Sequence, residues 1–86
     1  MLIIFPSAGE TRKASDWLHT QSISHAVIPI PNELEYQTGS DVALYLDTMD
    51  NMDVPMRLSR EQFVVMRVFR EFVWLGDVAP LKDAAE

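Results

Sequence analysis

The chain opens on an unbroken apolar run, Leu2-Ile3-Ile4-Phe5, which Pro6 ends. A strand with one side in water would alternate apolar and polar residues, and this run has no polar position. It therefore predicts a strand that is buried on both faces and lies in the centre of a sheet.

A helix start follows directly. Ser7-Ala8-Gly9-Glu10 is a capping-box pattern, in which the serine hydroxyl accepts from the third helical amide and the glutamate reaches back to the serine amide. Apolar residues spaced three and four apart then give one stripe, formed by Ala14, Trp17 and Leu18. We predict a helix over residues 8–19.

Two further strands are expected. Residues 24–30 form the second, and Pro29, which has no amide hydrogen, indicates that this strand is an edge or ends there. Strand, helix and strand in so short a span predict a βαβ unit. Residues 41–46 form the third strand, with Val42, Leu44 and Leu46 on one face and Ala43 and Tyr45 on the other.

A second capping-box pattern, Ser59-Arg60-Glu61-Gln62, predicts a last helix over residues 59–75 that ends at Gly76. On a helical wheel its apolar side chains cover more than half of the circumference, wider than one sheet needs. Two interpretations stay open: the helix is deep in the core, or it forms a self-association or partner surface. The side chains that would carry that surface are Phe63, Arg67, Arg70 and Trp74.

Together these elements predict an α+β fold, a small two-layer sandwich in the order βαβ-β-α. Its sheet of three or more strands would be packed by two helices. A chain of 86 residues has room for one core. We expect one domain over residues 1–76 and a frayed tail over residues 77–86.

Charge and cysteine content exclude whole function classes. The net charge of −6 argues against nucleic acid and against anionic membrane surfaces. No apolar run approaches the ~20 residues that span a bilayer. The absence of cysteine excludes disulfides, thiolate metal sites and a thiol nucleophile. The start has no signal-peptide pattern, and we expect a cytoplasmic protein.

Neither metal binding nor catalysis has a supporting pattern. Asp47, Asp50 and Asp53 lack the spacing of a calcium loop, and the nearby methionines, Met49, Met52 and Met56, are typical of core gap-filling. His19 and His25 sit in no metal spacing and beside no plausible nucleophile. We predict no catalytic residue, no metal and no cofactor.

The first half of the chain nevertheless resembles a family. Three stretches resemble small selenium- or sulfur-carrier-like domains of unknown function. They match the opening strand, the Pro-x-Pro segment, and the Cys-Gly position with the apolar strand after it, and they are Leu2-Ile3-Ile4-Phe5-Pro6-Ser7, Val27-Ile28-Pro29-Ile30-Pro31 and Ser40-Asp41-Val42-Ala43-Leu44. The resemblance covers residues 1–47. Where that family carries Cys-Gly this chain has Ser40-Asp41, and a hydroxyl cannot replace a thiolate carrier. The resemblance implies the scaffold without the chemistry.

Two functions follow as hypotheses. The first is a non-catalytic interaction or regulatory domain, expected to be a homodimer with an unidentified protein partner. The alternative is a small-ligand or anion-binding module at the strand ends, where open α/β sheets bind ligands. Its site residues would be Ser7, Pro31, Asn32, Ser40 and Asp41.

Overall fold

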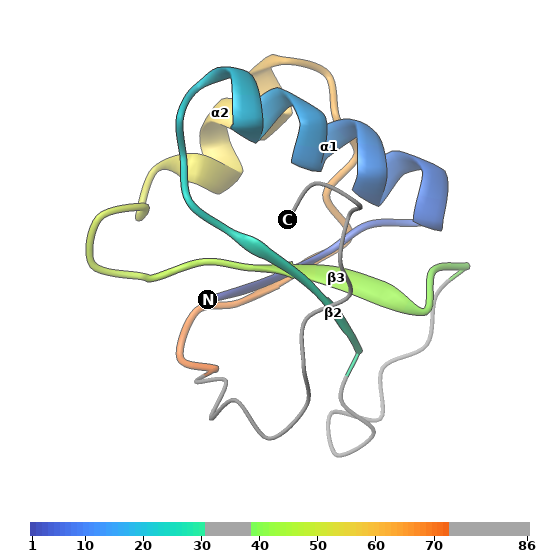
Figure 1. Ribbon diagram of the computed structural model, residues 1–86. Helices are drawn as coiled ribbons and strands as arrows, with labels where there is room; N and C mark the ends of the chain where they lie inside the picture. The colour runs from blue at the N-terminus through green and yellow to red at the C-terminus, as the bar shows by residue number, and fades with distance from the viewer. Residues whose placement is uncertain (31–38, 73–86) are drawn as a thin grey trace.

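The computed structural model describes residues 1–30 and 39–72. In chain order its elements are β1 (Leu2–Ile4), α1 (Ala8–Thr20), β2 (Ala26–Pro29), β3 (Val42–Tyr45), α2 (Val54–Arg60) and β4 (Arg67–Phe69). The four strands form one sheet in the order β2-β3-β1-β4, and each neighbouring pair is antiparallel. Both helices lie over one face of this sheet, so the predicted two-layer α+β fold is confirmed (Figure 1).

The strand β1 lies inside the sheet, with β3 on one side and β4 on the other. Its residues alternate between two clusters. Ile3 packs with the helix-side core, which includes Leu18 and Leu58, whereas Leu2 and Ile4 pack on the opposite face with Ile28 and Ala43. All three residues of the strand are fully buried. The prediction of a central strand covered on both faces is therefore confirmed.

The helix α1 begins where the capping pattern predicts. The Ser7 hydroxyl accepts from the Glu10 amide at 3.1 Å. The Glu10 carboxylate accepts from the backbone amide of Val64 at 3.4 Å, and so fastens the helix start to the segment before β4. The helix connects β1 to β2, which are both antiparallel to β3 and therefore parallel to each other, with β3 between them. The predicted βαβ connection thus crosses one strand.

The strand β2 is an edge of the described sheet and ends at Pro29, as predicted. Ile30 donates to the Asp41 carbonyl at 3.1 Å. Because backbone groups alternate in direction along an antiparallel strand, the amide positions of Ile28 and Ala26 also face β3, and that of Pro29 faces away. The proline therefore removes a donor only from the open edge, which protects that edge from further strand pairing.

The predicted helix over residues 59–75 is wrong for its described part. The helix α2 ends at Arg60, and Gln62 has a φ of 70°, a left-handed conformation that a continuing helix excludes. Ser59 is therefore near the end of a helix and does not cap the start of one. The start is at Val54, with Pro55 in the first turn, where a missing amide hydrogen costs nothing.

The chain after Gln62 runs extended into β4, which pairs with β1 in the register Leu2 to Phe69, Ile3 to Val68 and Ile4 to Arg67. The segment is rich in β-branched and aromatic residues, which favour strands. Its side chains also serve both sides of the sheet, since Val68 packs on the helix side and Phe69 on the other. Because its apolar side chains lie on both faces of the sheet, this segment gives a wide apolar arc when it is drawn as a helix. Trp74, Gly76 and the predicted domain boundary lie outside the described residues.

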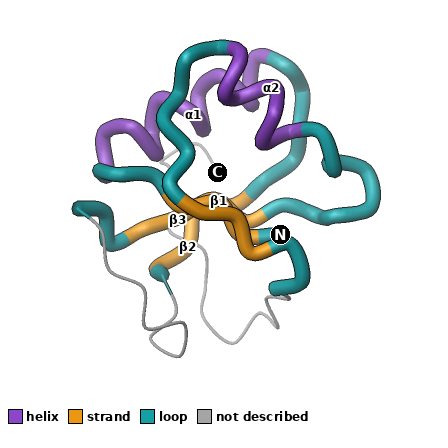
Figure 2. The backbone as a smooth tube through the Cα atoms, turned by 180° about the vertical axis from the view of Figure 1, so that it is seen from behind, coloured by secondary structure: helices purple, strands orange, loops and turns teal. Residues whose placement is uncertain are grey.

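Seen from behind, both helices again lie over the same face of the sheet (Figure 2). Within the described residues, neither helix has the length and apolarity that a membrane span requires.

The amino group of Met1 ties three parts of the fold together. It donates to the Leu46 carbonyl at 2.9 Å, to the Thr48 hydroxyl at 3.1 Å and to the Phe72 carbonyl at 3.2 Å. Burial lowers the pKa of this amino group below its usual 8.0, and the negative charge of Asp47 opposes that shift only in part.

This lowered pKa predicts a pH dependence of stability. At low pH the amino group is charged in both states, and burial penalises the charge only in the folded protein. Because the unfolded chain keeps its proton to higher pH, the free energy of unfolding should rise as the pH increases toward 8.0 and gain nothing more from this group above it. Urea denaturation over a pH series measures the rise. A chain acetylated at Met1 should lack this component, and an identical rise in it would contradict the assignment.

Candidate functional site

The structure brings together part of the predicted ligand site. The exposed Ser7 forms an isolated bridge with Gly39, and the side chain of Thr11 links the two segments further. Its hydroxyl donates to the Ser7 carbonyl at 2.9 Å and lies 3.3 Å from the Ser40 hydroxyl. The expected closeness of Ser7 and Ser40 is therefore present, with Thr11 as the connecting residue.

The hydroxyl groups around Ser7 and Ser40 form hydrogen bonds within the protein. Ser40, only 5% exposed, donates to the Val42 carbonyl at 2.7 Å and accepts from the Val42 amide at 3.1 Å. The side chain of Asp41 is exposed, and the backbone carbonyl of Asp41 accepts a hydrogen bond from the Ile30 amide. Pro31 and Asn32 lie outside the described residues. The described contacts fasten the start of α1 to the start of β3.

A serine–histidine contact is present that sequence reasoning missed. The Ser15 hydroxyl lies 2.6 Å from Nε2 of His25, and Nδ1 of the same ring lies 2.9 Å from the Ile23 carbonyl. Since a carbonyl can only accept, Nδ1 carries the proton and Nε2 accepts from Ser15 in the neutral ring. Sequence reasoning named no partner for His25, and the structure places Ser15 beside it. No sequence signal links the two, because Ser15 is mid-helix and His25 precedes β2.

This pair has the geometry of an activated nucleophile but not its access. Ser15 is only 1% exposed, so a substrate cannot reach its hydroxyl. The contact joins α1 to the chain before β2, and we assign it a structural role.

The residues predicted to form an interface do not share one helix, because α2 ends at Arg60 and β4 follows. Phe63 is half-buried and packs against the Trp17 ring, with ring centres 6.1 Å apart. Arg67 is exposed and its guanidinium lies 4.7 Å from the Phe69 ring centre. Arg70 is exposed and donates to the Met52 carbonyl at 3.2 Å. Trp74 lies outside the described residues.

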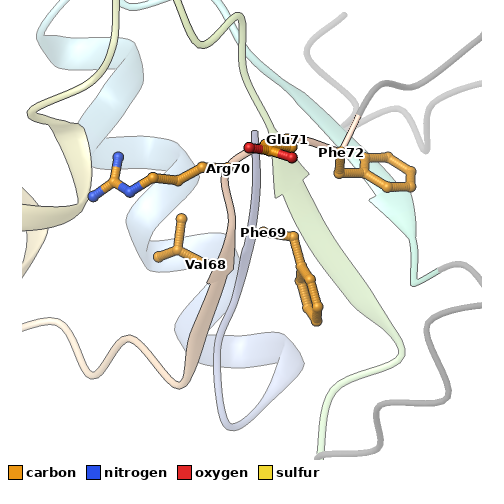
Figure 3. A pocket seen from close by; sticks show the side chains of 5 residues that line it. All are labelled: Val68, Phe69, Arg70, Glu71 and Phe72. Atoms are coloured by element: carbon orange, nitrogen blue, oxygen red, sulfur yellow. The ribbon is translucent and has the colours of Figure 1, made fainter.

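An open hollow of about 450 Å³ lies beside the end of β4. The described residues that line it are Val68, Phe69, Arg70, Glu71 and Phe72. Figure 3 shows Val68 and Arg70 on one side of the strand and Phe69 and Phe72 on the other. The only ionisable side chains in this lining are Arg70 and Glu71, and the guanidinium of Arg70 already binds a backbone carbonyl. The hollow brings no set of catalytic groups together.

The most unusual surface feature is a set of exposed apolar side chains. Met49 is 86% exposed, Met52 59% and Met56 57%, all between β3 and the second turn of α2. Val64 and Met66, which are 55% and 46% exposed, precede β4. The prediction that Met49, Met52 and Met56 fill gaps in the core is wrong. Among residues 1–30 and 39–72, no three histidine or carboxylate side chains gather as a metal site would require.

Comparison with known proteins adds no relative: no family model, no curated protein and no solved structure matches this chain. The resemblance to carrier-like domains therefore stays a prediction.

Proposed function

We propose that this chain is a non-catalytic, cytoplasmic protein-interaction domain that forms a homodimer through the surface before and along β4. We call this the β4 surface and define it by Val64, Met66, Arg67 and Arg70. The observation that supports it is the exposure of Val64 and Met66, at 55% and 46%, which are followed in the chain by two exposed arginines. Exposed apolar groups that are rimmed by polar ones are typical of association sites.

The chemistry of the β4 surface favours a protein partner. A homodimer with a two-fold axis places the same patch of both copies face to face, so Val64 and Met66 would bury one another. The arginines at the rim would meet an acidic molecule, since the net charge is −6. Methionine and arginine are both enriched in protein interfaces. The same net charge disfavours nucleic acid and anionic membranes as partners.

Sedimentation equilibrium tests this proposal. The unaltered chain should self-associate at micromolar concentration, and the double variant Val64→Lys/Met66→Lys should raise the dimer Kd about tenfold or more, because two like charges would be buried against two others. Met49→Lys is the matched control, since it adds a charge on an exposed methionine outside this surface. It should leave the dimer Kd nearly unchanged.

Circular dichroism of the double variant separates loss of association from loss of fold. A monomeric unaltered chain at high micromolar concentration would contradict the dimer. A folded double variant that dimerises as well as the unaltered chain would contradict the β4 surface as its interface.

The alternative of a small-ligand or anion-binding module, related to carrier-like domains, is supported by one observation. Ser7, Thr11 and Ser40 lie together at the start of α1, where backbone amides attract anions. We rank this alternative second because the described hydroxyls are already hydrogen-bonded within the protein. A phosphate titration followed by amide NMR shifts at Ser7 and Ala8 separates it from the first proposal.

A further inference from the structure

The connection between β3 and α2 carries a second exposed surface that the proposed dimer does not use. We call it the methionine surface and define it by Met49, Met52 and Met56 with the interleaved carboxylates Asp47, Asp50 and Asp53. All six side chains are exposed, and Met49 is the most exposed large apolar residue among those described, at 86%. A solvated acidic turn has no need of three methionines in water.

The backbone of this connection is already fixed by the protein. The Met49 amide donates to the Asp47 carboxylate at 3.1 Å, and the Asn51 side chain donates to the Asp47 carbonyl at 2.7 Å. The Val54 amide donates to the Asn51 carbonyl at 3.1 Å. The Met52 carbonyl accepts a hydrogen bond from the guanidinium of Arg70. A partner that binds here would not have to order the loop, which lowers the entropic cost of association.

These same bonds decide how a partner could be recognised. Strand addition needs a row of unused backbone amides and carbonyls, whereas the amides of Met49 and Val54 and the carbonyl of Met52 are used inside the chain. Recognition would therefore rely on side chains. Methionine is unbranched and polarisable, so three exposed methionines can adapt to apolar groups of different shapes.

The negative charges of the methionine surface determine which charge a partner segment should carry. Within the described part of the chain, no lysine or arginine forms an ion pair with Asp47, Asp50 or Asp53. A segment that covered the methionines with apolar or acidic residues would bring Asp50 and Asp53 out of water without a counter-charge, which is unfavourable. A segment with apolar side chains on one side and lysine or arginine beside them would cover the methionines and also supply positive charges for the carboxylates.

We propose that the methionine surface binds a basic amphipathic helix of a partner protein. The apolar face of that helix would lie on Met49, Met52 and Met56, and its basic residues would pair with Asp47, Asp50 and Asp53. The proposal does not depend on the homodimer, because the two surfaces share no residue.

Methionine methyl NMR tests it directly. The chain has five methionines, and the fully buried Met1 serves as an internal reference. The probe is a synthetic amphipathic helix of leucine and lysine. Its addition should shift the methyl signals of Met49, Met52 and Met56 and leave those of Met1 and Met66 in place. Variants at single methionines assign the signals.

Matched variants then separate a local site from general attraction between opposite charges. Asp50→Asn/Asp53→Asn should weaken peptide binding about tenfold or more, since both lost charges lie in the surface. Asp16→Asn/Asp41→Asn removes two exposed carboxylates elsewhere and changes the net charge equally, so it should weaken binding much less. Val64→Lys/Met66→Lys should leave these shifts unchanged, whatever it does to the dimer.

Four results would overturn the proposal. They are absence of methyl shifts, equal weakening by the two aspartate pairs, equal binding of a peptide with leucine and glutamate, and equal binding of a scrambled leucine and lysine peptide that lacks an apolar face. Shifts of the same three methyl signals with protein concentration alone would show that a second copy covers this surface instead.

Discussion

Replacing Leu58 by alanine should lower the free energy of unfolding by about 2–5 kcal/mol. Leu58 is fully buried in the helix-side core with Ile3, Leu18 and Leu44. Its removal would leave a cavity between α2 and the sheet, and the close-packed neighbours can fill that space only in part. Urea denaturation followed by circular dichroism measures the loss.

Met56→Ala is the matched control on the same helix. Met56 is 57% exposed and belongs to neither core cluster, so its truncation should change stability by less than about 0.5 kcal/mol. The pair tests the position of α2, because the helix predicted from the sequence began only at residue 59. Equal effects of the two substitutions would contradict the burial of Leu58 under α2.

The second large effect is expected at Gly39, where two backbone segments meet. A Cβ atom at this position would lie 2.4 Å from the Pro6 carbonyl oxygen, which is backbone and cannot rotate away. The bridge between Ser7 and Gly39 would have to open. Gly39→Ala should therefore destabilise the protein by about 1–3 kcal/mol, as overpacking does elsewhere. The midpoint of urea denaturation provides the measurement.

Gly9→Ala is the control for Gly39→Ala. Gly9 lies in the first turn of α1, and the nearest atom to an added Cβ is the Ser7 hydroxyl at 3.9 Å, an ordinary contact. Alanine loses less conformational entropy than glycine when a helix forms, so the free energy of unfolding of this variant should rise by about 0.5–1 kcal/mol. A Gly39→Ala protein as stable as the unaltered chain would show that α1 and β3 do not meet as described.

The first half of the fold could be predicted because its signals are local. The apolar run before Pro6, the Ser7 cap and the missing amide of Pro29 each restrict the backbone within a few residues. The second half misled because the apolar side chains of Val68 and Phe69, which pack on opposite faces of the sheet, fit a helical wheel as well as they fit a strand. Pro55 was the unused signal, since a proline in a first helical turn places the start of α2 before residue 59.

The candidate surfaces were harder to predict than the fold. The ligand-site hypothesis assumed that Ser7 and Ser40 are close, and the antiparallel pairing of β1 with β3 explains why they are. The contact of Ser15 with His25 did not, because it depends on the rotation of α1 against the chain before β2. The exposure of Met49 could not be deduced either, since methionine fills core gaps and also occurs at adaptable binding surfaces.

The corrected fold and the proposed homodimer surface depend on one claim, that the chain from Val64 leads into a strand paired with β1 and does not form a helix. Backbone NMR tests it most directly. The account predicts strand-type Cα shifts over Arg67–Phe69 and nuclear Overhauser contacts between the backbones of Ile3 and Val68, which are register partners. Helical Cα shifts with continuous amide-to-amide contacts from Ser59 to Phe72, and no contact between Ile3 and Val68, would contradict it.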